Sequence, residues 1–151
     1  MEQVLSLKYE HFDSLESLPA EDIELIGKAQ QAAQKAHAPY SSFHVGAAAR
    51  LLSGKVLTAA NCESEVFPSG MCAERSLLYF LQTNFPDEPI VAFAIASSPN
   101  ERECYPCGGC RQALLDAQRR QQSPIRIIMS SGTTASVVES AEILLPFSFR
   151  L

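Results

Sequence analysis

Two short strings in the chain carry the residue types of a metal site that could do chemistry. They are Cys72-Ala73-Glu74 and Pro106-Cys107-Gly108-Gly109-Cys110. Together they offer three cysteine thiolates, which are good zinc ligands, and one carboxylate that could carry a proton. Three protein ligands leave zinc a fourth position for water, whose pKa the metal lowers. The pattern therefore predicts a zinc hydrolase that acts on an amidine-like carbon.

Both strings stand at the start of a predicted helix. Free backbone N–H groups and the positive end of the helix dipole lower the pKa of a thiol there. Three thiolates around one divalent ion carry a net negative charge, so the site needs positive charge nearby. Arg75 and Arg111 directly follow the two motifs and are predicted to donate hydrogen bonds to the ligand sulfurs. The alternative is a pair of solvated arginines in a first helical turn.

The cysteine spacing leaves two other kinds of metal site open. With Cys104 before it, the second string resembles part of an iron–sulfur motif, for which Cys72 could supply a fourth ligand. Against this, Arg111-Gln112-Ala113 replaces the cysteine and proline that complete the usual ferredoxin spacing. A closed structural zinc site would instead take Cys104 or Cys62 as its fourth ligand. Glu74 favours a catalytic site, because a structural site has no use for a carboxylate two residues after a ligand, although a first-turn glutamate also stabilises a helix.

Composition and charge indicate a single globular domain of the soluble type. The chain has 151 residues, of which 46% are hydrophobic and 19% charged. Acidic residues outnumber basic ones by 17 to 12 and no Lys/Arg run is present, so a polynucleotide partner is not expected. We find no signal-like leader and no apolar stretch near the roughly 20 residues of a membrane helix. The five cysteines favour metal binding in a reducing compartment over disulfides. We therefore expect a cytoplasmic protein without membrane contact.

The first part of the chain predicts one strand and one helix. Apolar alternation in Val4–Tyr9 predicts a short extra strand within an N-terminal extension, residues 1–20, that precedes a single zinc-dependent domain, residues 21–151. A helix is expected to start after Pro19 and to continue to about His37. Its buried face is expected to contain Ile23, Ile26, Ala29, Ala33 and Ala36, which are spaced three or four apart.

The rest of the chain predicts strands and helices in alternation. Phe43–Leu52 and Lys55–Asn61 are expected to form a hairpin linked by Ser53-Gly54, and Gly46 with the alanines after it leaves room for a helix or a ligand. The remaining elements are helix Cys72–Gln82, strand Ile90–Ala96, helix Gly109–Gln121, strand Ile125–Met129, strand Ser136–Glu139 and a short helix at Ala141–Leu145. This alternation predicts an α/β sandwich.

Three motifs, in order, make the chain similar to a known enzyme family. They are Ala38-Pro39-Tyr40-Ser41-Ser42-Phe43 with Val45-Gly46-Ala47-Ala48, Cys72-Ala73-Glu74-Arg75, and Pro106-Cys107-Gly108-Gly109-Cys110-Arg111-Gln112. From about residue 20 to Phe149 the chain closely resembles the small, homotetrameric cytidine deaminases. The resemblance implies a three-layer α/β/α sandwich with a mixed five-stranded sheet, one Zn²⁺ per chain, and a homotetramer with its sites at subunit interfaces. It also implies hydrolysis of free cytidine and deoxycytidine to uridine and deoxyuridine by a zinc-bound hydroxide, with release of ammonia, in pyrimidine salvage.

The resemblance assigns the reacting groups by position. Cys72, Cys107 and Cys110, called the cysteine triad below, resemble the zinc ligands of the family. Glu74 resembles its proton shuttle, which takes a proton from the water and returns it to the substrate.

The resemblance also assigns contacts to the substrate. Asn61 and Glu63 match the family's Asn-x-Glu pair, which holds the ribose hydroxyl, and positions i and i+2 at a strand end face the same way. In the plain alternative, Asn61 ends a strand and Glu63 is solvated. Phe43 resembles the aromatic residue that packs on the pyrimidine, and Ala73 is a further substrate contact. Phe149 resembles the terminal phenylalanine that reaches a neighbouring subunit's site, although a lone phenylalanine is commonly part of a core.

Two segments depart from the family pattern. Ser64-Glu65-Val66-Phe67 stands where the family commonly has Asn, Ala, a small residue and Tyr. Tyr105 is bulkier than the residue that often precedes Pro106, and in the family this backbone lies near the exocyclic amine. These departures leave open a deaminase of a related aminopyrimidine, such as a blasticidin-type antibiotic nucleoside.

Two further functions remain alternatives. One is a non-catalytic, zinc-stapled binding or assembly domain. The other is a nucleic-acid editing deaminase, against which the net charge of −5 argues. Polynucleotide-editing relatives also usually carry His where this chain has Cys72.

Overall fold

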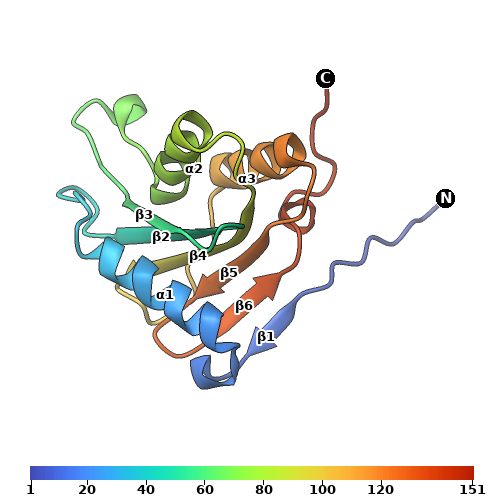
Figure 1. Cartoon of the computed structure of the whole chain (residues 1–151), viewed down its shortest axis with the longest axis horizontal. Helices are drawn as coiled ribbons and strands as arrows, with labels where there is room; N and C mark the ends of the chain where they lie inside the picture. Colours follow the sequence, from blue (N-terminus) through green and yellow to red (C-terminus); the bar gives the residue numbers. More distant parts are fainter.

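A mixed six-stranded sheet forms the centre of the fold (Figure 1). The computed structural model describes residues 1–151, and its strands lie in the order β1-β6-β5-β4-β2-β3. β4 and β5 run parallel, and every other neighbouring pair is antiparallel. The strands are β1 (Glu10–Phe12), β2 (His44–Leu51), β3 (Val56–Ala60), β4 (Ile90–Ser98), β5 (Arg126–Ser130) and β6 (Ala135–Val138).

Helices cover both faces of this sheet (Figure 1). α1 (Ala20–Ala33) lies on one face, and α2 (Ala73–Asn84) and α3 (Gly108–Gln121) lie on the other. A cluster of 22 buried residues, including Phe93 and Leu114, fills the space under α2 and α3, and a cluster of 11 lies under α1. Burial of apolar surface on both faces holds the layers together. The predicted three-layer α/β/α fold is confirmed, with one strand more than the five expected.

The additional strand comes from the N-terminal residues. β1 pairs with β6, with His11 opposite Ser136 and Phe12 opposite Ala135. The strand predicted at Val4–Tyr9 is wrong in position, because residues 1–9 contain no strand or helix and extend away from the sheet (Figure 1). The apolar residues of that segment are more than half exposed. Alternation alone does not form a strand where no partner strand and no second layer are present.

α1 approaches β2 closely at Gly46. A Cβ atom at this position would lie 1.9 Å from the carbonyl oxygen of Ala29 and 2.5 Å from the backbone nitrogen of Ala33. Backbone atoms cannot move aside as a flexible side chain can, so only glycine fits without displacing α1. The expected room beside this glycine is therefore occupied by a helix.

The buried face of α1 is rotated from the predicted one. The inward residues are Asp22, Leu25, Ile26, Ala29, Ala32 and Ala33. Ile23 is 40% exposed, so its predicted burial is wrong. The helix ends at Ala33 and not near His37, so the predicted end is also wrong and Ala36 lies beyond the helix. The physical reason is an ion pair, since Asp22 turns inward and lies 2.7 Å from Arg126 of β5. Residue 23, one position further on, then points toward solvent.

The other predicted elements agree with the structure to within a few residues. They include the β2–β3 hairpin, both later helices, the strands from β4 onward and a short 3₁₀ helix at Ala141–Leu144. No helix has both the length and the apolar character needed to cross a membrane.

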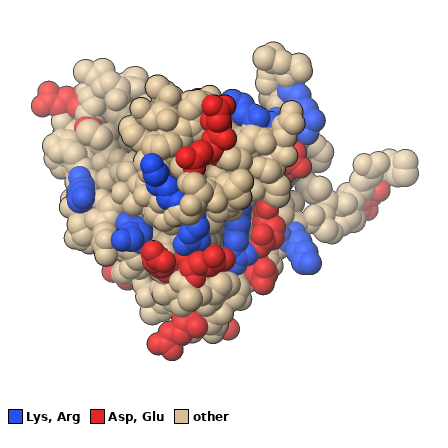
Figure 2. All heavy atoms as spheres, viewed as in Figure 1, with Lys and Arg blue, Asp and Glu red and all other residues tan.

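Charged side chains of both signs are mixed on the face that carries α1 (Figure 2). Arg126, for example, pairs with both Asp22 and Glu139.

Candidate metal centre and active-site pocket

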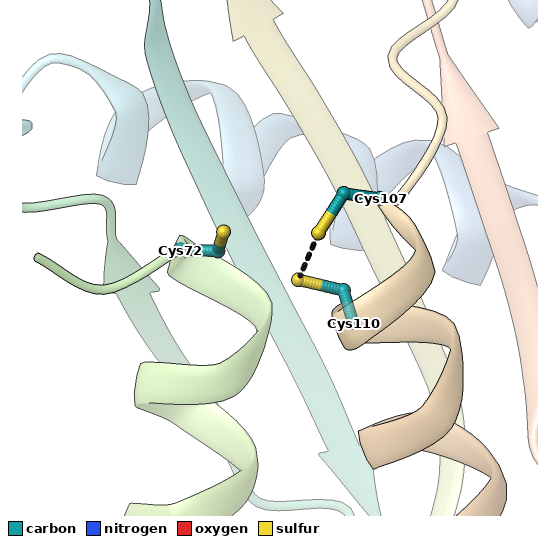
Figure 3. Close-up of side chains that lie close together, drawn as sticks. All are labelled: Cys72, Cys107 and Cys110. Atoms are coloured by element: carbon teal, nitrogen blue, oxygen red, sulfur yellow. Dashed lines mark hydrogen bonds between the residues drawn. The ribbon is translucent and has the colours of Figure 1, made fainter. Parts of the chain in front are cut away.

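The three sulfur atoms of the cysteine triad converge at the starts of two helices (Figure 3). Cys72 directly precedes α2, Cys107 directly precedes α3, and Cys110 lies in the first turn of α3. All three Sγ atoms lie within 4.8 Å of one another, and those of Cys107 and Cys110 are 3.5 Å apart. Tetrahedral zinc–sulfur bonds of about 2.3 Å place ligand sulfurs about 3.8 Å apart. The triad therefore has the dimensions and the donor type of a zinc site.

The helix starts explain why these thiols meet. The side chains of Cys72 and Cys107 accept no capping hydrogen bond, so their sulfurs remain free to point toward each other. The first-turn N–H groups of α2 and α3, two helices in contact on the same face of the sheet, add positive potential where the sulfurs meet. This potential favours thiolates and hence metal binding.

Hydrogen bonding shifts the acidity of the triad. The hydrogen bond from Cys110, supported by Arg75, lowers the pKa of Cys72 to about 5. Arg75 Nη2 donates to Cys72 Sγ at 3.7 Å. The same Cys72–Cys110 hydrogen bond, together with burial, raises the pKa of Cys110. A thiolate is thus present at neutral pH to begin metal binding, which then releases protons from thiol ligands.

Glu74 lies two residues after Cys72, in the first turn of α2, and is only 4% exposed. Burial raises the pKa of Glu74, and the charge of Cys72 adds to the effect. Burial thus makes the protonated form of Glu74 more accessible than that of a solvent-exposed glutamate, which suits a group that must both accept and return a proton. Its place beside the triad is suited to proton transfer at a metal-activated water.

A cavity of about 260 Å³, called the catalytic pocket below, opens beside the triad. Its lining residues are Ser41, Phe43, Val45, Asn61, Glu63, Cys72, Ala73, Glu74, Cys104, Tyr105 and Cys107. The pocket thus brings together residues from segments far apart in the sequence. A larger hollow of about 350 Å³ between α2 and α3 contains none of the predicted site residues. The cavity that contains the predicted site residues is therefore the smaller of these two.

Asn61 directly follows β3 and joins two backbone segments at the pocket. Its Oδ1 accepts a hydrogen bond from the N–H of Val45 at 2.7 Å, and its Nδ2 donates to the carbonyl oxygen of Phe43 at 2.9 Å. The side chain is therefore more than the end of a strand, because it holds the chain at the start of β2 against the end of β3.

Glu63 holds the turn that precedes Phe43. Its Oε1 accepts hydrogen bonds from the N–H groups of Tyr40 and Ser41 at 3.0 and 3.1 Å. Hydrogen bonding from Ser41, together with that from Tyr40, lowers the pKa of Glu63. The group is therefore a carboxylate at neutral pH, and it has further lone pairs with which to accept hydrogen bonds.

Comparison with known proteins identifies the family of this site. A family model described as "Cytidine and deoxycytidylate deaminase zinc-binding region" matches residues 19–123, which include the triad and Glu74. The chain belongs to this deaminase family. Together with the converging sulfurs, the match gives it one zinc site, formed by the cysteine triad.

Individual relatives agree with the family match. The chain is 37% identical over 92 residues to a cytidine deaminase of Halalkalibacterium halodurans. This match covers 61% of this chain and 68% of the relative. The chain is 38% identical over 92 residues, with the same coverage, to a cytidine deaminase of Mycobacterium tuberculosis.

Solved structures of the family share the fold. A crystal structure of cytidine deaminase from Burkholderia pseudomallei superposes with a TM-score of 0.73 at 31% identity, over 87% of this chain and all of that one. The M. tuberculosis enzyme superposes with a TM-score of 0.70 at 30% identity, over 88% of this chain and all of that one.

In this member of the deaminase family, the two arginines after the motifs have different partners. Arg75 donates to a triad sulfur, as described above. Arg111 donates from Nε to the carbonyl oxygen of Pro106 at 2.9 Å and from Nη1 to that of Leu144 at 3.2 Å, and it donates to no sulfur. Carbonyl oxygens are the stronger acceptors. Arg111 thus fixes the backbone that leads into Cys107.

The predicted substrate contacts divide into two groups. Phe43 and Ala73 line the catalytic pocket with Asn61 and Glu63. Phe149 does not line it and is 73% exposed, with its carbonyl oxygen 3.3 Å from Nη1 of Arg119. Any contact of Phe149 with a substrate therefore requires a second copy of this deaminase-family chain.

Two cysteines proposed as fourth ligands lie outside the group of converging sulfurs. Cys62 is exposed, and Cys104 is buried in the wall of the catalytic pocket. Burial raises the pKa of Cys104 to about 11, which keeps it a neutral thiol. A zinc ion held by the triad would consequently have three protein ligands and room for a water, as in catalytic zinc sites.

Sequence reasoning gave no role in this deaminase pocket to Ser41, Val45 or Cys104, and it singled out Tyr105 only for its bulk. Ser41 and Val45 come from the segment that carries Phe43, and Tyr105 is two residues from Cys107, so closeness to the motifs was the available signal. The phenol of Tyr105 donates a hydrogen bond to Glu103, and this bond raises the pKa of Tyr105.

Proposed function

We propose that the chain deaminates free cytidine and deoxycytidine by hydrolysis, giving uridine or deoxyuridine and ammonia. The observation that carries this proposal is the composition of the catalytic pocket. A buried carboxylate, Glu74, stands beside three converging thiols, and Asn61 and Glu63 belong to the same cavity. The relatives named cytidine deaminase support the same substrate class.

The reacting groups divide the chemistry between them. When bound by the cysteine triad, zinc lowers the pKa of a water molecule and supplies a nucleophile at neutral pH. Glu74 accepts one proton from that water and delivers it to N3 of the pyrimidine. It then takes the remaining proton from the oxygen that has added to the ring and delivers it to the departing amine. One carboxylate can serve both steps, because its buried position faces a single pocket and its raised pKa permits either direction of transfer.

The remaining pocket residues orient the nucleoside. Glu63 accepts hydrogen bonds as a carboxylate, so it suits a ribose hydroxyl, and Asn61 holds the backbone beside it. The ring of Phe43 offers an apolar surface for the pyrimidine. Because free nucleosides carry no phosphate, an overall negative charge does not oppose their binding.

Of the two departures from the family pattern, residues 64–67 lie beside the catalytic pocket and not in it. Ser64 and Phe67 line a neighbouring hollow of about 300 Å³, where Phe67 makes an edge-to-face contact with Tyr40. This placement supports cytidine over an antibiotic nucleoside, since the altered side chains of residues 64–67 do not line the pocket that contains Glu74. The other departure, Tyr105, does line it.

We infer a homotetramer as the working form, with sites at the subunit interfaces. Large apolar side chains are exposed on α2 (Tyr79 and Phe80) and near the C-terminus (Phe147 and Phe149). Exposed apolar groups of this size are typical of contact surfaces. Size-exclusion chromatography with light scattering tests this, and a monomer at micromolar concentration would contradict it.

The proposed cellular setting is pyrimidine salvage in the cytoplasm. Five free cysteines, three of them forming the metal site, support a reducing compartment.

A substrate panel tests the proposed reaction. Zinc-loaded protein is assayed for ammonia release from cytidine, deoxycytidine, cytosine, adenosine, guanine and blasticidin S, with Glu74→Gln as matched control. We expect turnover of the first two compounds alone, and loss of it in the control. Turnover of blasticidin S alone would transfer the assignment to an antibiotic nucleoside, and no turnover of any compound would support a zinc-stapled binding domain.

A further inference from the structure

The catalytic pocket shares a wall with a second cavity. This cavity, called the side cavity below, has a volume of about 600 Å³. Phe43, Cys104 and Tyr105 line both the side cavity and the catalytic pocket. Tyr105 is the largest of the three shared side chains. Removing its ring would therefore enlarge the catalytic pocket toward space that already exists in the protein.

Tyr105 is held in this wall by an anchored hydrogen bond. Its hydroxyl donates to Oε2 of Glu103 at 2.9 Å. The Glu103 side chain is only 6% exposed, and its Oε1 accepts a hydrogen bond from Oγ1 of Thr134 at 2.8 Å. A carboxylate with both oxygens engaged has little freedom to move. The phenol ring is consequently positioned by the protein, although more than half of Tyr105 is exposed.

The N-terminal strand completes this anchor. His11 of β1 lies with Nδ1 3.1 Å from Oγ of Ser136 and 3.5 Å from Oε1 of Glu103. The pairing of β1 with β6 places His11 there, and the N–H of Leu15 holds the following turn through the carbonyl oxygen of Thr133 at 2.9 Å. A segment that contributes nothing to the metal site thus supports a residue in the pocket wall.

The shared wall lies at the reacting side of the pocket. Tyr105 is two residues before the ligand Cys107, and Cys104 adjoins it. Asn61, Glu63 and Ser41 form a separate hydrogen-bonded group assigned to the sugar. A departing amine is attached to the attacked carbon, so it must leave beside the triad and Glu74, where Tyr105 limits the space.

We propose that Tyr105 is a specificity-determining residue that limits the size of the substituent on the departing amine, and that Glu103, supported by His11 of β1, is its positioning residue. The inference rests on the proposed cytidine deamination. The reaction that reports on it is N4-methylcytidine plus water giving uridine plus methylamine. A C–O bond forms as the C–N bond breaks, and the protons from water go to the ring product and the amine.

The first experiment compares two substrates in each variant. The ratio of kcat/KM for N4-methylcytidine to kcat/KM for cytidine is measured for the zinc-loaded wild type, Tyr105→Phe and Tyr105→Ala. Inactive or misfolded protein lowers both values equally and leaves this ratio unchanged. We expect the ratio to rise about tenfold or more in Tyr105→Ala, because this is the usual effect of making room for one methyl group in a pocket. The ratio should rise by less in Tyr105→Phe, which keeps the ring but loses its hydrogen bond to Glu103.

The second experiment tests the anchor. Glu103→Ala removes the acceptor and should raise the ratio in the same direction as Tyr105→Phe. Glu103→Gln keeps an oxygen that can accept from the phenol and should return the ratio toward the wild-type value. Arg102→Ala is the matched control, because Arg102 lines the side cavity and not the catalytic pocket. Deletion of residues 2–8, which precede β1, is a second control, and both controls should keep the wild-type ratio.

The outcomes separate this inference from the proposed function. Wild-type protein that is inactive on cytidine would overturn the proposed function. If the wild type is active on cytidine but the ratio in Tyr105→Ala stays within about twofold of the wild-type ratio, the role of Tyr105 is overturned and the proposed function stands. An unchanged ratio in Glu103→Ala, when Tyr105→Ala does change it, would overturn the anchor. An equal rise of the ratio in Arg102→Ala would assign the effect to the side cavity as a whole. It would contradict the proposal that Tyr105 in the shared wall limits the substituent.

Discussion

The catalytic pocket has two halves that the fold positions by different means. The reacting half, formed by the cysteine triad and Glu74, sits at the starts of α2 and α3. The recognition half, formed by Asn61 and Glu63, is held to the turn before β2 by hydrogen bonds between residues 16 to 23 positions apart. The first half depends on local helix geometry, and the second depends on the order of two loops.

This difference predicts two kinds of mutational effect. Conservative substitutions in the reacting half should remove zinc or turnover while the fold remains, because helices α2 and α3 are buried against the sheet by other residues. Substitutions in the recognition half should change substrate affinity and stability together, because the side chains proposed to recognise the substrate also hold the loops.

The largest effect is expected from Cys107→Ser. Loss of one thiolate from a three-ligand site should remove zinc and, with it, all measurable cytidine turnover. Metal content by mass spectrometry and ammonia release are the measurements. Cys62→Ser and Cys104→Ser are matched controls, since neither sulfur belongs to the triad, and both should keep zinc near one per chain. Loss of zinc from Cys104→Ser would show that the site is a closed, structural one.

Glu74→Gln should have the next largest effect. The amide keeps the size of the side chain but cannot accept a proton, so kcat should fall by about 10²–10⁴-fold at equal zinc content. Circular dichroism should be unchanged. A loss of less than about tenfold would show that Glu74 is not the shuttle, because it lies below the usual contribution of a general acid–base group.

Asn61→Ala should produce the mixed effect of the recognition half. The variant loses two hydrogen bonds, to Val45 and Phe43, each worth about 0.5–1.5 kcal/mol, so the free energy of unfolding should fall by about 1–3 kcal/mol. The KM for cytidine should rise as the loop loses its order. Chemical denaturation and steady-state kinetics measure the two effects. A change in kcat alone, with stability and KM unchanged, would contradict the division into halves.

Removal of residues 149–151 should have the smallest of these effects. Phe149 lies outside the pocket of its own chain, so the deletion acts on catalysis only where a neighbouring copy is bound. We expect a raised KM or a lowered kcat with normal zinc content. The kinetics should be measured at protein concentrations where light scattering shows the assembled form. Unchanged kinetics in that form would remove Phe149 from the recognition half.

Most of the reacting half could be predicted from the sequence because its determinants are local. The two cysteine strings, the helix starts beside them and the apolar periodicity of α2 and α3 all lie within short windows. The hairpin of β2 and β3 was predictable for the same reason. These features require no knowledge of which distant segments meet.

The features that sequence reasoning missed depend on distant partners. The rotation of α1 follows from Asp22 pairing with Arg126, 104 positions away. The place of β1 follows from the edge of β6, where His11 meets Ser136 across 125 positions. The hydrogen bonds of Arg111 to Pro106 and Leu144 could not be distinguished in the sequence from bonds to sulfur. No single window contains both members of such a pair.

The short β1 strand also has a consequence for how the molecule behaves in concentrated solution. It covers the outer edge of β6, whose N–H and C=O groups would otherwise be available to the strand of another molecule. At three residues, β1 itself offers an incoming strand little to pair with. Chains cut between β1 and α1, for example by a protease, should therefore aggregate edge to edge and become less soluble.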